Sequence, residues 1–317
     1  MKNITNINDC LPVCAALSSQ VRIDIINLLL KNKSMNLDSL AKILGLTNGA
    51  ITAHIKKLSE AGLINVTTSS GVRGSQKLCA LAVDKIIIDI IGNNIQANTY
   101  DFEVDVGHYS DYEIYPTCGI VTKDSIIGEL DDPRYFSYPE RFNAGLLWFT
   151  EGFVEYKIPN ALKSNQKAIE LQFTFEIASE APGFSSQYPS DIYFSVNGIE
   201  LGFWTSPGEF NDRPGIVSPS WWFKNLGQYG RYKLLIINKD GTFIDGLPIG
   251  PTTIGDLEIY HNSNITFRIE APKKAANRGG VTLFGKTFGD YPSGIKIRLV
   301  YENKTKNGNG NEVINSG

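Results

Sequence analysis

Leu37 to Leu81 reads LDSLAKILGLTNGAITAHIKKLSEAGLINVTTSSGVRGSQKLCAL, and this stretch decides the fold of the N-terminal part of the chain. Asn36 precedes it and is a good N-cap residue. The apolar residues that follow recur at helical spacing: Leu37, Leu40, Ala41 and Leu44. Gly45 can adopt the left-handed conformation that ends a helix. The sequence therefore predicts a short amphipathic helix that stops at Gly45.

A second helix is predicted from Thr47, the next N-cap candidate, to about Ala61, with Gly62 ending it. Its apolar face consists of Ala50, Ile51, Ile55, Leu58 and Ala61. Two strand-like segments follow, at 63–66 and 77–81, with turn residues at 69–71 between them. A helix, a turn, a second helix and a two-stranded hairpin are typical of a winged helix, whose second helix can enter the major groove of DNA.

The combined pattern resembles the ArsR-type winged-helix family of bacterial transcriptional regulators. The resemblance rests on LSSQVRIDIINLL at 17–29, on the helix-turn-helix above and on ITAHIKKLSEAGLI at 51–64, and it covers roughly the first quarter of the chain. It implies a homodimer, a recognition helix in the major groove of a double-stranded operator, and a wing against the adjacent backbone. Winged helices also serve as protein-interaction modules, but the basic residues on this one favour DNA.

Eight polar or basic residues are the candidate DNA contacts: Asn48, Thr52, His54, Lys56, Lys57, Ser59, Arg73 and Lys77. The long cationic side chains of Lys56 and Lys57 suit phosphates, which gives affinity rather than sequence choice. The shorter side chains of Asn48, Thr52 and Ser59 are better suited to base edges. For His54, contact with the groove and packing between helices remain open alternatives.

The distribution of charge also separates the N-terminal part of the chain from the rest. Residues 1–92 hold 10 Lys and Arg against 6 Asp and Glu, a net charge of +4. The whole chain has 30 basic and 33 acidic residues, so the remainder holds 20 and 27, a net charge of −7. A basic N-terminal part on an acidic body is expected if only the N-terminal part touches nucleic acid.

Two departures from the family pattern limit what the resemblance implies. The helix LDSLAKILGL lacks the Cys-x-Cys metal motif of metal-sensing members, and Cys10 and Cys14 are better explained as small core residues. We therefore expect no metal and no cofactor. The segment VDKIIIDII at 83–91 is short and β-branched, so it predicts a strand or buried connector rather than a dimerisation helix. The dimer interface is then expected in the first helix, in the body or in both.

The body shows short alternating strands separated by turn signals, such as Asn197-Gly198 and Asp245-Gly246. The expected strands are 149–158, 169–177, 191–196, 232–237, 264–270 and 295–301. The fold class is therefore α+β and multidomain. It comprises a winged helix-turn-helix domain at 1–92, a connecting segment packed on the sandwich at 93–145, a large antiparallel, jelly-roll-like β-sandwich at 146–302, and a disordered tail at 303–317.

One long loop of the body combines aromatic and charged residues in a way that suits a small polar ligand. The candidate effector-binding residues are Trp204, Glu209, Asn211, Asp212, Arg213, Trp221 and Trp222. Indole faces stack on sugar rings, while charged side chains form hydrogen bonds with the hydroxyl groups of the sugar. On a β-sandwich, this combination resembles carbohydrate-binding jelly rolls. The alternative is that the Trp residues are core anchors and that the loop covers a sheet edge.

The sequence contains no nucleophile elbow, P-loop or His-rich metal motif, so binding is favoured over catalysis and no catalytic residue is assigned. No signal peptide opens the chain and no apolar run could span a bilayer, which predicts a cytoplasmic protein without a membrane partner. We expect a DNA-binding regulator that senses a small polar effector such as a sugar. In the family that the chain resembles, repression relieved by a ligand is the commoner mode, so we expect a repressor. The alternatives are a carbohydrate-active enzyme with a DNA-binding head, and a sandwich that only mediates dimerisation or protein docking.

Overall fold

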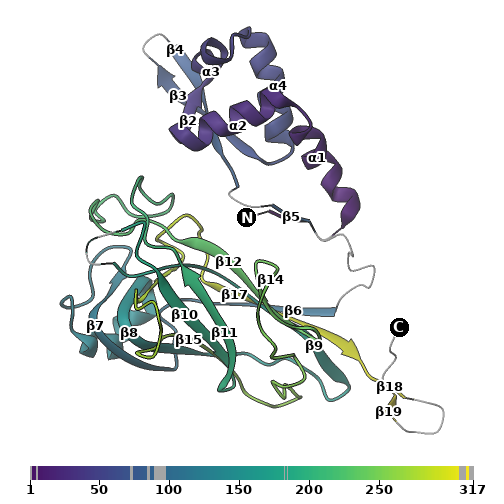
Figure 1. Ribbon diagram of the computed structural model, residues 1–317, viewed down its shortest axis with the longest axis vertical. Coiled ribbons are helices and arrows are strands. Elements are labelled where there is room, and N and C mark those ends of the chain that lie inside the picture. The colour runs from purple at the N-terminus through teal and green to yellow at the C-terminus, as the bar shows by residue number, and fades with distance from the viewer. Residues whose placement is uncertain are drawn as a thin grey trace. The chain divides into compact units, whose positions relative to one another are not determined.

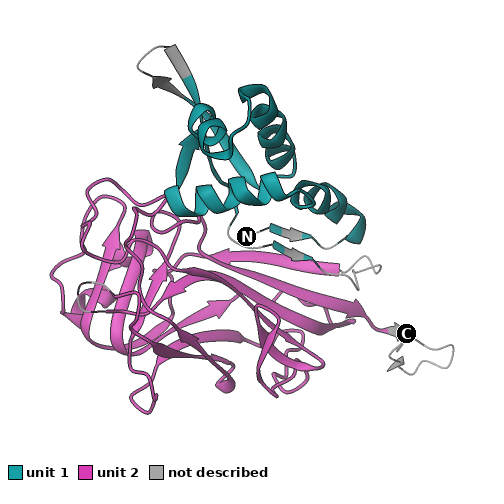
Figure 2. Ribbon diagram, turned by 45° about the horizontal axis from the view of Figure 1, so that its top comes forward, with its two compact units in different colours: residues 1–96 teal, residues 97–317 magenta. Residues whose placement is uncertain are grey.

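The computed structural model describes residues 2–4, 6–71, 74–83, 86–88, 98–181, 183, 185–306 and 312–313. The chain divides into two compact units, unit 1 at 1–96 and unit 2 at 97–317 (Figure 2). The two units have separate hydrophobic cores.

Unit 1 is a helical domain with a small sheet (Figure 1). Its elements are β1 (Lys2–Ile4), η1 (Ile7–Cys10), α1 (Leu11–Leu17), α2 (Gln20–Asn32), β2 (Ser34–Asn36), α3 (Leu37–Leu44), α4 (Asn48–Glu60), β3 (Ile64–Gly71), β4 (Gly74–Leu81) and β5 (Ile86–Ile88). The antiparallel sheet has the order β2-β4-β3, and β1 pairs with β5 in parallel. The strand predicted within 83–91 is therefore present as β5.

The predicted caps define the helix-turn-helix. Asn36 accepts a hydrogen bond from the Ser39 backbone N–H at 2.8 Å, and Thr47 accepts one from Ala50 at 3.3 Å. Gly45 ends α3 in the left-handed conformation, at φ +65°. Because both helix starts and the turn are fixed by local hydrogen bonds, the angle between α3 and α4 follows from a few sequence positions.

The core of unit 1 uses the predicted apolar face of α4, on which Ile51, Ile55 and Leu58 are all buried. A buried arginine also ties two helices together. Arg22 of α2 donates from Nε to the carbonyl of Ala16 at 2.5 Å and from Nη2 to that of Ala15 at 2.8 Å. These are carbonyls at the end of α1, where a cation also complements the helix dipole.

Unit 2 is built from antiparallel strands. They are β6 (Asn98–Val104), β7 (Asp111–Thr122), β8 (Ala144–Ile158), β9 (Gln166–Ala178), β10 (Ser190–Val196), β11 (Ile199–Ser206), β12 (Arg231–Asn238), β13 (Gly241–Ile244), β14 (Leu247–Gly250), β15 (Ile265–Ala271), β16 (Val281–Phe284) and β17 (Ile295–Asn303), followed by β18 (Thr305–Lys306) and β19 (Glu312–Val313). Two short helices, η2 (Pro133–Ser137) and η3 (Pro139–Asn143), precede β8. All six strands expected from sequence alternation are present.

The strands form two layers that pack face to face (Figure 1). One layer runs β11-β10-β15-β8-β7, the other β6-β17-β9-β12-β13-β14, and β16 joins them by pairing with both β8 and β9. The buried Phe173 ring of β9 stacks on Phe267 of β15 with centroids 3.9 Å apart. Since β9 and β15 share no backbone ladder, this contact crosses the core of a sandwich.

The segment 93–145 was expected to connect the two domains. Residues 93–97 lie outside the described part of the chain, and from Asn98 onward the segment supplies β6 and β7 to the sheet. Burial of Cys118, Ile120 and Val121 explains why β7 joins the sandwich. Of the predicted disordered tail, 303–306 and 312–313 are described, and β18 pairs with β19. The remainder of that prediction falls outside the described residues.

Among the described helices, no single one is long and apolar enough to cross a membrane. Ile7–Leu17 and Gln20–Asn32 reach that length and apolarity only together, as a pair bent by 86°.

Phe267→Ala should lower the free energy of unfolding of unit 2 by about 3–5 kcal/mol, because it empties a fully buried site between the two layers. All four Trp residues belong to unit 2, so denaturant unfolding followed by Trp fluorescence reports on this unit alone. Phe203→Ala is the control, since that ring is 43% exposed and its loss should cost about 1 kcal/mol or less. Equal losses in the two variants would contradict the assignment of this core.

Candidate functional site

The exposed face of α4 carries four of the predicted DNA contacts. Asn48, Thr52, Lys56 and Ser59 are spaced three or four residues apart and all are exposed, while Ile51, Ile55 and Leu58 anchor the opposite face. This spacing places the four side chains in one stripe along the helix. Lys57 is exposed beside that stripe. The helix therefore presents a polar and basic surface of the kind that fits a major groove.

Local contacts hold part of this stripe in place. The Asn48 side chain donates to Asp38 Oδ1 of α3 at 2.7 Å, and the Thr52 hydroxyl donates to the Asn48 carbonyl at 2.7 Å. Lys56 Nζ lies 3.8 Å from Glu60, in a pair that is largely exposed on both sides. Such a surface pair is weak, so Lys56 can exchange Glu60 for a phosphate at little cost.

His54 differs from its neighbours on α4 because it is partly buried. Burial lowers the pKa of this imidazole, and the positive charges of Arg22 and Lys57 lower it further. The ring is therefore neutral near pH 7, which favours packing between helices over an electrostatic contact with phosphate.

The wing consists of β3 and β4, paired over their full length from Ile64–Leu81 to Gly71–Gly74. Lys77 is exposed on β4, opposite Thr68. Arg73, the other predicted wing contact, lies outside the described residues. The described part of the wing thus offers one of the two predicted cationic side chains.

In unit 2 the predicted effector residues separate into three places. Trp204 lies within β11, opposite Ile192, and packs against the main core. The ammonium group of Lys233 lies over its indole ring, 4.1 Å from the centroid. Trp204 is thereby held by the sandwich and is separate from the other Trp residues of the loop.

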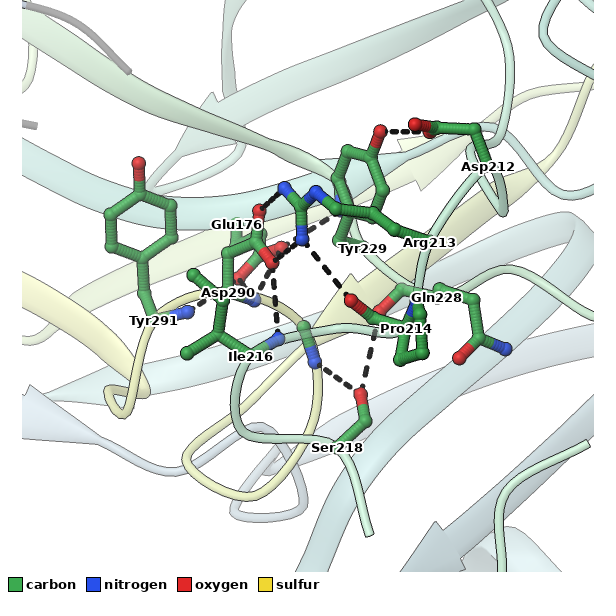
Figure 3. Close-up of polar contacts among 12 residues, drawn as sticks. Glu176, Asp212, Arg213, Pro214, Ile216, Ser218, Gln228, Tyr229, Asp290 and Tyr291 are labelled. Carbon is green, nitrogen blue, oxygen red and sulfur yellow. Dashed lines mark hydrogen bonds and ion pairs between the residues drawn. The ribbon is translucent and has the colours of Figure 1, made fainter. Parts of the chain in front are cut away.

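Asn211, Asp212 and Arg213 each contact other residues of unit 2, and Figure 3 shows the contacts of Asp212 and Arg213. Arg213 forms a two-pronged ion pair with Asp290, at 2.6 and 2.5 Å, and its guanidinium lies 3.9 Å from the Tyr229 ring centroid. Asp212 accepts a hydrogen bond from the Tyr229 hydroxyl. Asn211 donates to the Lys224 carbonyl at 3.4 Å. These side chains fasten the loop to the sandwich.

The anchor beneath this loop is a buried carboxylate, Glu176, at the end of β9 (Figure 3). It accepts backbone N–H groups from Gly230 at 2.8 Å, from Asp290 at 2.9 Å and from Tyr291 at 3.1 Å. Burial raises the pKa of Glu176, and these three hydrogen bonds act in the opposite direction. One side chain thus joins the loop before β12 to the loop before β17.

Glu209 and Trp222 meet in a partly open pocket of unit 2, with a cavity volume of about 170 Å³. We call it the acidic pocket. Its other polar and aromatic walls come from residues scattered along the chain: Thr117 of β7, Asp131, Trp148 of β8, Glu180 after β9 and Thr282 of β16. An engineered cavity of about 150 Å³ accommodates benzene, so this space has room for one six-membered ring.

The acidic pocket holds two carboxyl groups whose pKa values are both raised above the ordinary value of Glu. Glu209 is 4% exposed, and its Oε2 has no hydrogen-bond partner among the described residues. Burial raises its pKa to about 8, with repulsion from Glu180 as the second cause, while the Ala181 backbone N–H acts in the opposite direction. Burial also raises the pKa of Glu180 to about 7, against a hydrogen bond from the Thr117 hydroxyl at 3.0 Å. Two mutually repelling carboxyl groups therefore share one cavity.

The aromatic wall is rigid. The rings of Trp148 and Trp222 meet edge to face with centroids 6.0 Å apart, and Trp222 Nε1 donates to the Gly227 carbonyl at 2.9 Å. Trp221 packs against Trp222 at 5.8 Å and donates to the Lys123 carbonyl at 2.6 Å, so it supports the wall from outside. The predicted pair thus divides into one wall residue and one supporting residue.

A second cavity of about 190 Å³ lies beside Thr150, Asp191, Asn277 and Arg278. Its buried carboxylate is already satisfied, because Asp191 accepts hydrogen bonds from Thr205 at 2.7 Å and from the Asn277 side chain and backbone, both at 3.0 Å. The acidic pocket is therefore the stronger ligand site. Among the described residues, no three His, Cys, Asp or Glu side chains gather closely enough to hold a metal ion.

Residues 19–65 match the family model of winged helix-turn-helix DNA-binding domains. Together with the geometry of α3, α4 and the wing, this match identifies unit 1 as a winged helix-turn-helix DNA-binding domain. A comparison with curated proteins finds no significant match.

Three solved structures are similar to parts of the chain. A transcriptional regulator homologue from Pyrococcus horikoshii OT3 has 22% identity, with 23% of this chain and 77% of that chain covered, at a TM-score of 0.19. The Agl-KA catalytic domain has 9% identity over 49% of this chain and 20% of that chain, at 0.20. The Emp47p carbohydrate recognition domain has 10% identity over 64% and 95%, at 0.20. Such low identities and TM-scores give these likenesses no weight in assigning a function.

Replacing Lys56 and Lys57 together by Ala should weaken binding to all DNA duplexes alike, because contacts with phosphates are independent of sequence. The slope of log affinity against log salt concentration should fall by about 1 for each phosphate that a lysine no longer neutralises. Fluorescence anisotropy with duplexes selected from a random library, and with scrambled versions, measures both quantities. Lys31→Ala on α2 is the matched control. A weakening confined to the selected duplexes would show that these lysines read bases instead.

The stability of unit 2 should decline as pH rises from 4.5, the ordinary pKa of Glu, to about 8. Over this range the folded protein retains protons on Glu176, Glu180 and Glu209 that the unfolded chain releases. Glu209→Gln should flatten the decline and raise the free energy of unfolding at pH 8.5 by about 1–3 kcal/mol. Denaturant unfolding followed by Trp fluorescence at several pH values tests this, and a parallel decline in the variant and the original would refute it.

Proposed function

We propose that the protein is a DNA-binding transcriptional repressor whose unit 2 senses a small polar effector, a carbohydrate, in the acidic pocket. The observation that carries the proposal is that one chain contains both a winged helix and a separate sandwich with a ring-sized pocket. Glu209 Oε2 is buried and has no hydrogen-bond partner among the described residues, and a ligand that donates a hydrogen bond to it would offset the free-energy cost of its desolvation.

The chemistry of the acidic pocket suits a sugar. Trp148 and Trp222 supply flat apolar surface, while Glu180 and Glu209 can accept hydrogen bonds from hydroxyl groups. Thr117 and Thr282 add hydroxyls that can donate or accept. A ligand with one apolar face and several hydroxyl groups would use all of these side chains at once.

Regulation would operate through a homodimer. Two copies of α4 reach two half-sites of an operator, and an effector changes DNA affinity only if it binds the DNA-bound and DNA-free forms with different strength. In our proposal, the sugar prefers the DNA-free form and so releases repression. The ratio of DNA affinities with and without sugar then equals the ratio of sugar affinities with and without DNA.

Duplexes selected from a random library by the full chain provide the operator for a test of this proposal. Saturating effector should weaken operator binding by about 5- to 150-fold, the usual range of coupling between two sites. Sedimentation velocity on the same samples should show a dimer. An unchanged operator affinity in the presence of a sugar that demonstrably binds unit 2 would exclude the sensing role and would favour a sandwich used for docking alone.

Glycoside hydrolysis in the acidic pocket is a second candidate, favoured by the two coupled carboxyl groups with raised pKa. A protonated carboxylic acid near neutral pH is what a glycosidase needs as its general acid. Release of 4-nitrophenol from a panel of aryl glycosides, abolished by Glu180→Gln, would support it. We propose binding without turnover, and this assay should therefore show no release above the rate in buffer.

A further inference from the structure

We propose that the acidic pocket selects a ligand that carries a protonated amine on a small ring, which makes the effector an amino sugar. The ammonium group would lie against Glu180 and Glu209, and the ring would lie against Trp148 and Trp222. The inference deepens the proposed function and rests on it for its regulatory meaning.

The first argument is the charge of the acidic pocket. Asp131, Glu180 and Glu209 line it, and no Lys, Arg or His is among the described residues around it. Within the described part of the chain, the ion pairs of the sandwich involve neither Glu180 nor Glu209. A protonated amine would supply the positive charge that no described side chain lining the acidic pocket provides.

The second argument is the unpartnered oxygen of Glu209. The side chain is buried, its Oε1 has a long 3.5 Å contact with the Thr282 hydroxyl, and its Oε2 has no partner among the described residues. A buried carboxylate in this condition is costly to ionise. An ammonium group supplies both the counter-charge and the missing donors, and hydrogen bonds between charged groups are about twice as strong as neutral ones.

The third argument is the aromatic wall beside the carboxylates. The faces of indole rings attract cations, most strongly when the cation is desolvated. Trp148 and Trp222 are 8% and 5% exposed and belong to a small core cluster with Phe284 and Phe288, so the indole surface that lines the pocket is small and poorly hydrated. Carboxylates together with desolvated indole rings form a site in which an ammonium group gains more than a hydroxyl group does.

A metal ion is a poorer fit than an organic cation. Small divalent ions need several oxygen ligands that converge within about 2.6 Å of one point. Among the described residues, no three Asp, Glu, His or Cys side chains are arranged in this way. A bare ion would also make no use of the apolar wall, which is formed by Leu146, Leu226 and the two indole rings.

Isothermal titration calorimetry on the full chain at pH 7, with probes matched in shape but not in charge, tests the inference. D-glucosamine should bind at least ten-fold more tightly than D-glucose and N-acetyl-D-glucosamine, and cyclohexylamine more tightly than cyclohexanol. Calcium and magnesium chloride should give no heat beyond dilution. Equal affinities for the charged and neutral members of both pairs, or no binding by either amine, would overturn the inference.

Two variants and a control locate the binding. Glu209→Gln and Glu180→Gln should each reduce the affinity for the amine at least ten-fold more than they reduce the affinity for its neutral partner. Glu140→Gln, at an exposed position in η3, should bind as the original chain does. Thermal unfolding of each variant separates a binding defect from a folding defect, and Glu209→Gln is expected to be more stable at pH 8.5. Amine binding that survives both pocket variants would place the site elsewhere.

The two proposals can fail separately. Amines that bind in the acidic pocket without altering operator affinity would uphold the ligand class and defeat sensing. A neutral sugar that binds there and weakens operator binding would uphold sensing and defeat the ligand class.

Discussion

Much of unit 2 depends on one buried carboxylate. Glu176 binds three backbone N–H groups from two loops, and Asp290 in the second loop holds Arg213 in the first (Figure 3). The first loop carries Glu209 and Trp222, two walls of the acidic pocket. A long loop without secondary structure would otherwise sample many conformations, and this network removes that freedom. The position of the pocket's carboxylate thus follows from a side chain that does not line the pocket.

The two units use charge in opposite ways. In unit 1, cationic side chains are exposed on α4 and on the wing, so water solvates their charge in the free protein. When DNA binds, phosphates replace part of this water. In unit 2, carboxyl groups are withdrawn from water and repel each other. Exposed charge gives affinity for a polyanion of any sequence, whereas buried charge is selective because only a complementary partner can offset its desolvation.

Local features of the sequence were enough for the winged helix and for the strands. The caps at Asn36, Gly45 and Thr47 act over three or four residues, and alternation within a strand is equally short-ranged. The pocket could not be found in this way, since Thr117, Glu180 and Thr282 come together only when distant strands pair. For the same reason, the sequence alone suggests Arg213 as a ligand-binding residue. Its ion-pair partner Asp290 lies 77 positions away in the sequence and comes close to it only in the folded chain. Trp204 was grouped with Trp222 by closeness in sequence, but strand pairing places it on β11.

The arrangement of the acidic pocket depends on the absence of a side chain at Gly227. A Cβ atom at this position would lie 2.0 Å from Glu209 Oε1, closer than any real contact, so the carboxylate can occupy the cavity only because residue 227 lacks a side chain. The same residue's carbonyl orients Trp222. Replacement of this glycine by alanine, a single nucleotide change, would push the Glu209 carboxyl group aside and keep the aromatic wall. Under the proposed sensing role, descendants of this protein could then differ in the ligand that unit 2 binds while unit 1 stays unchanged.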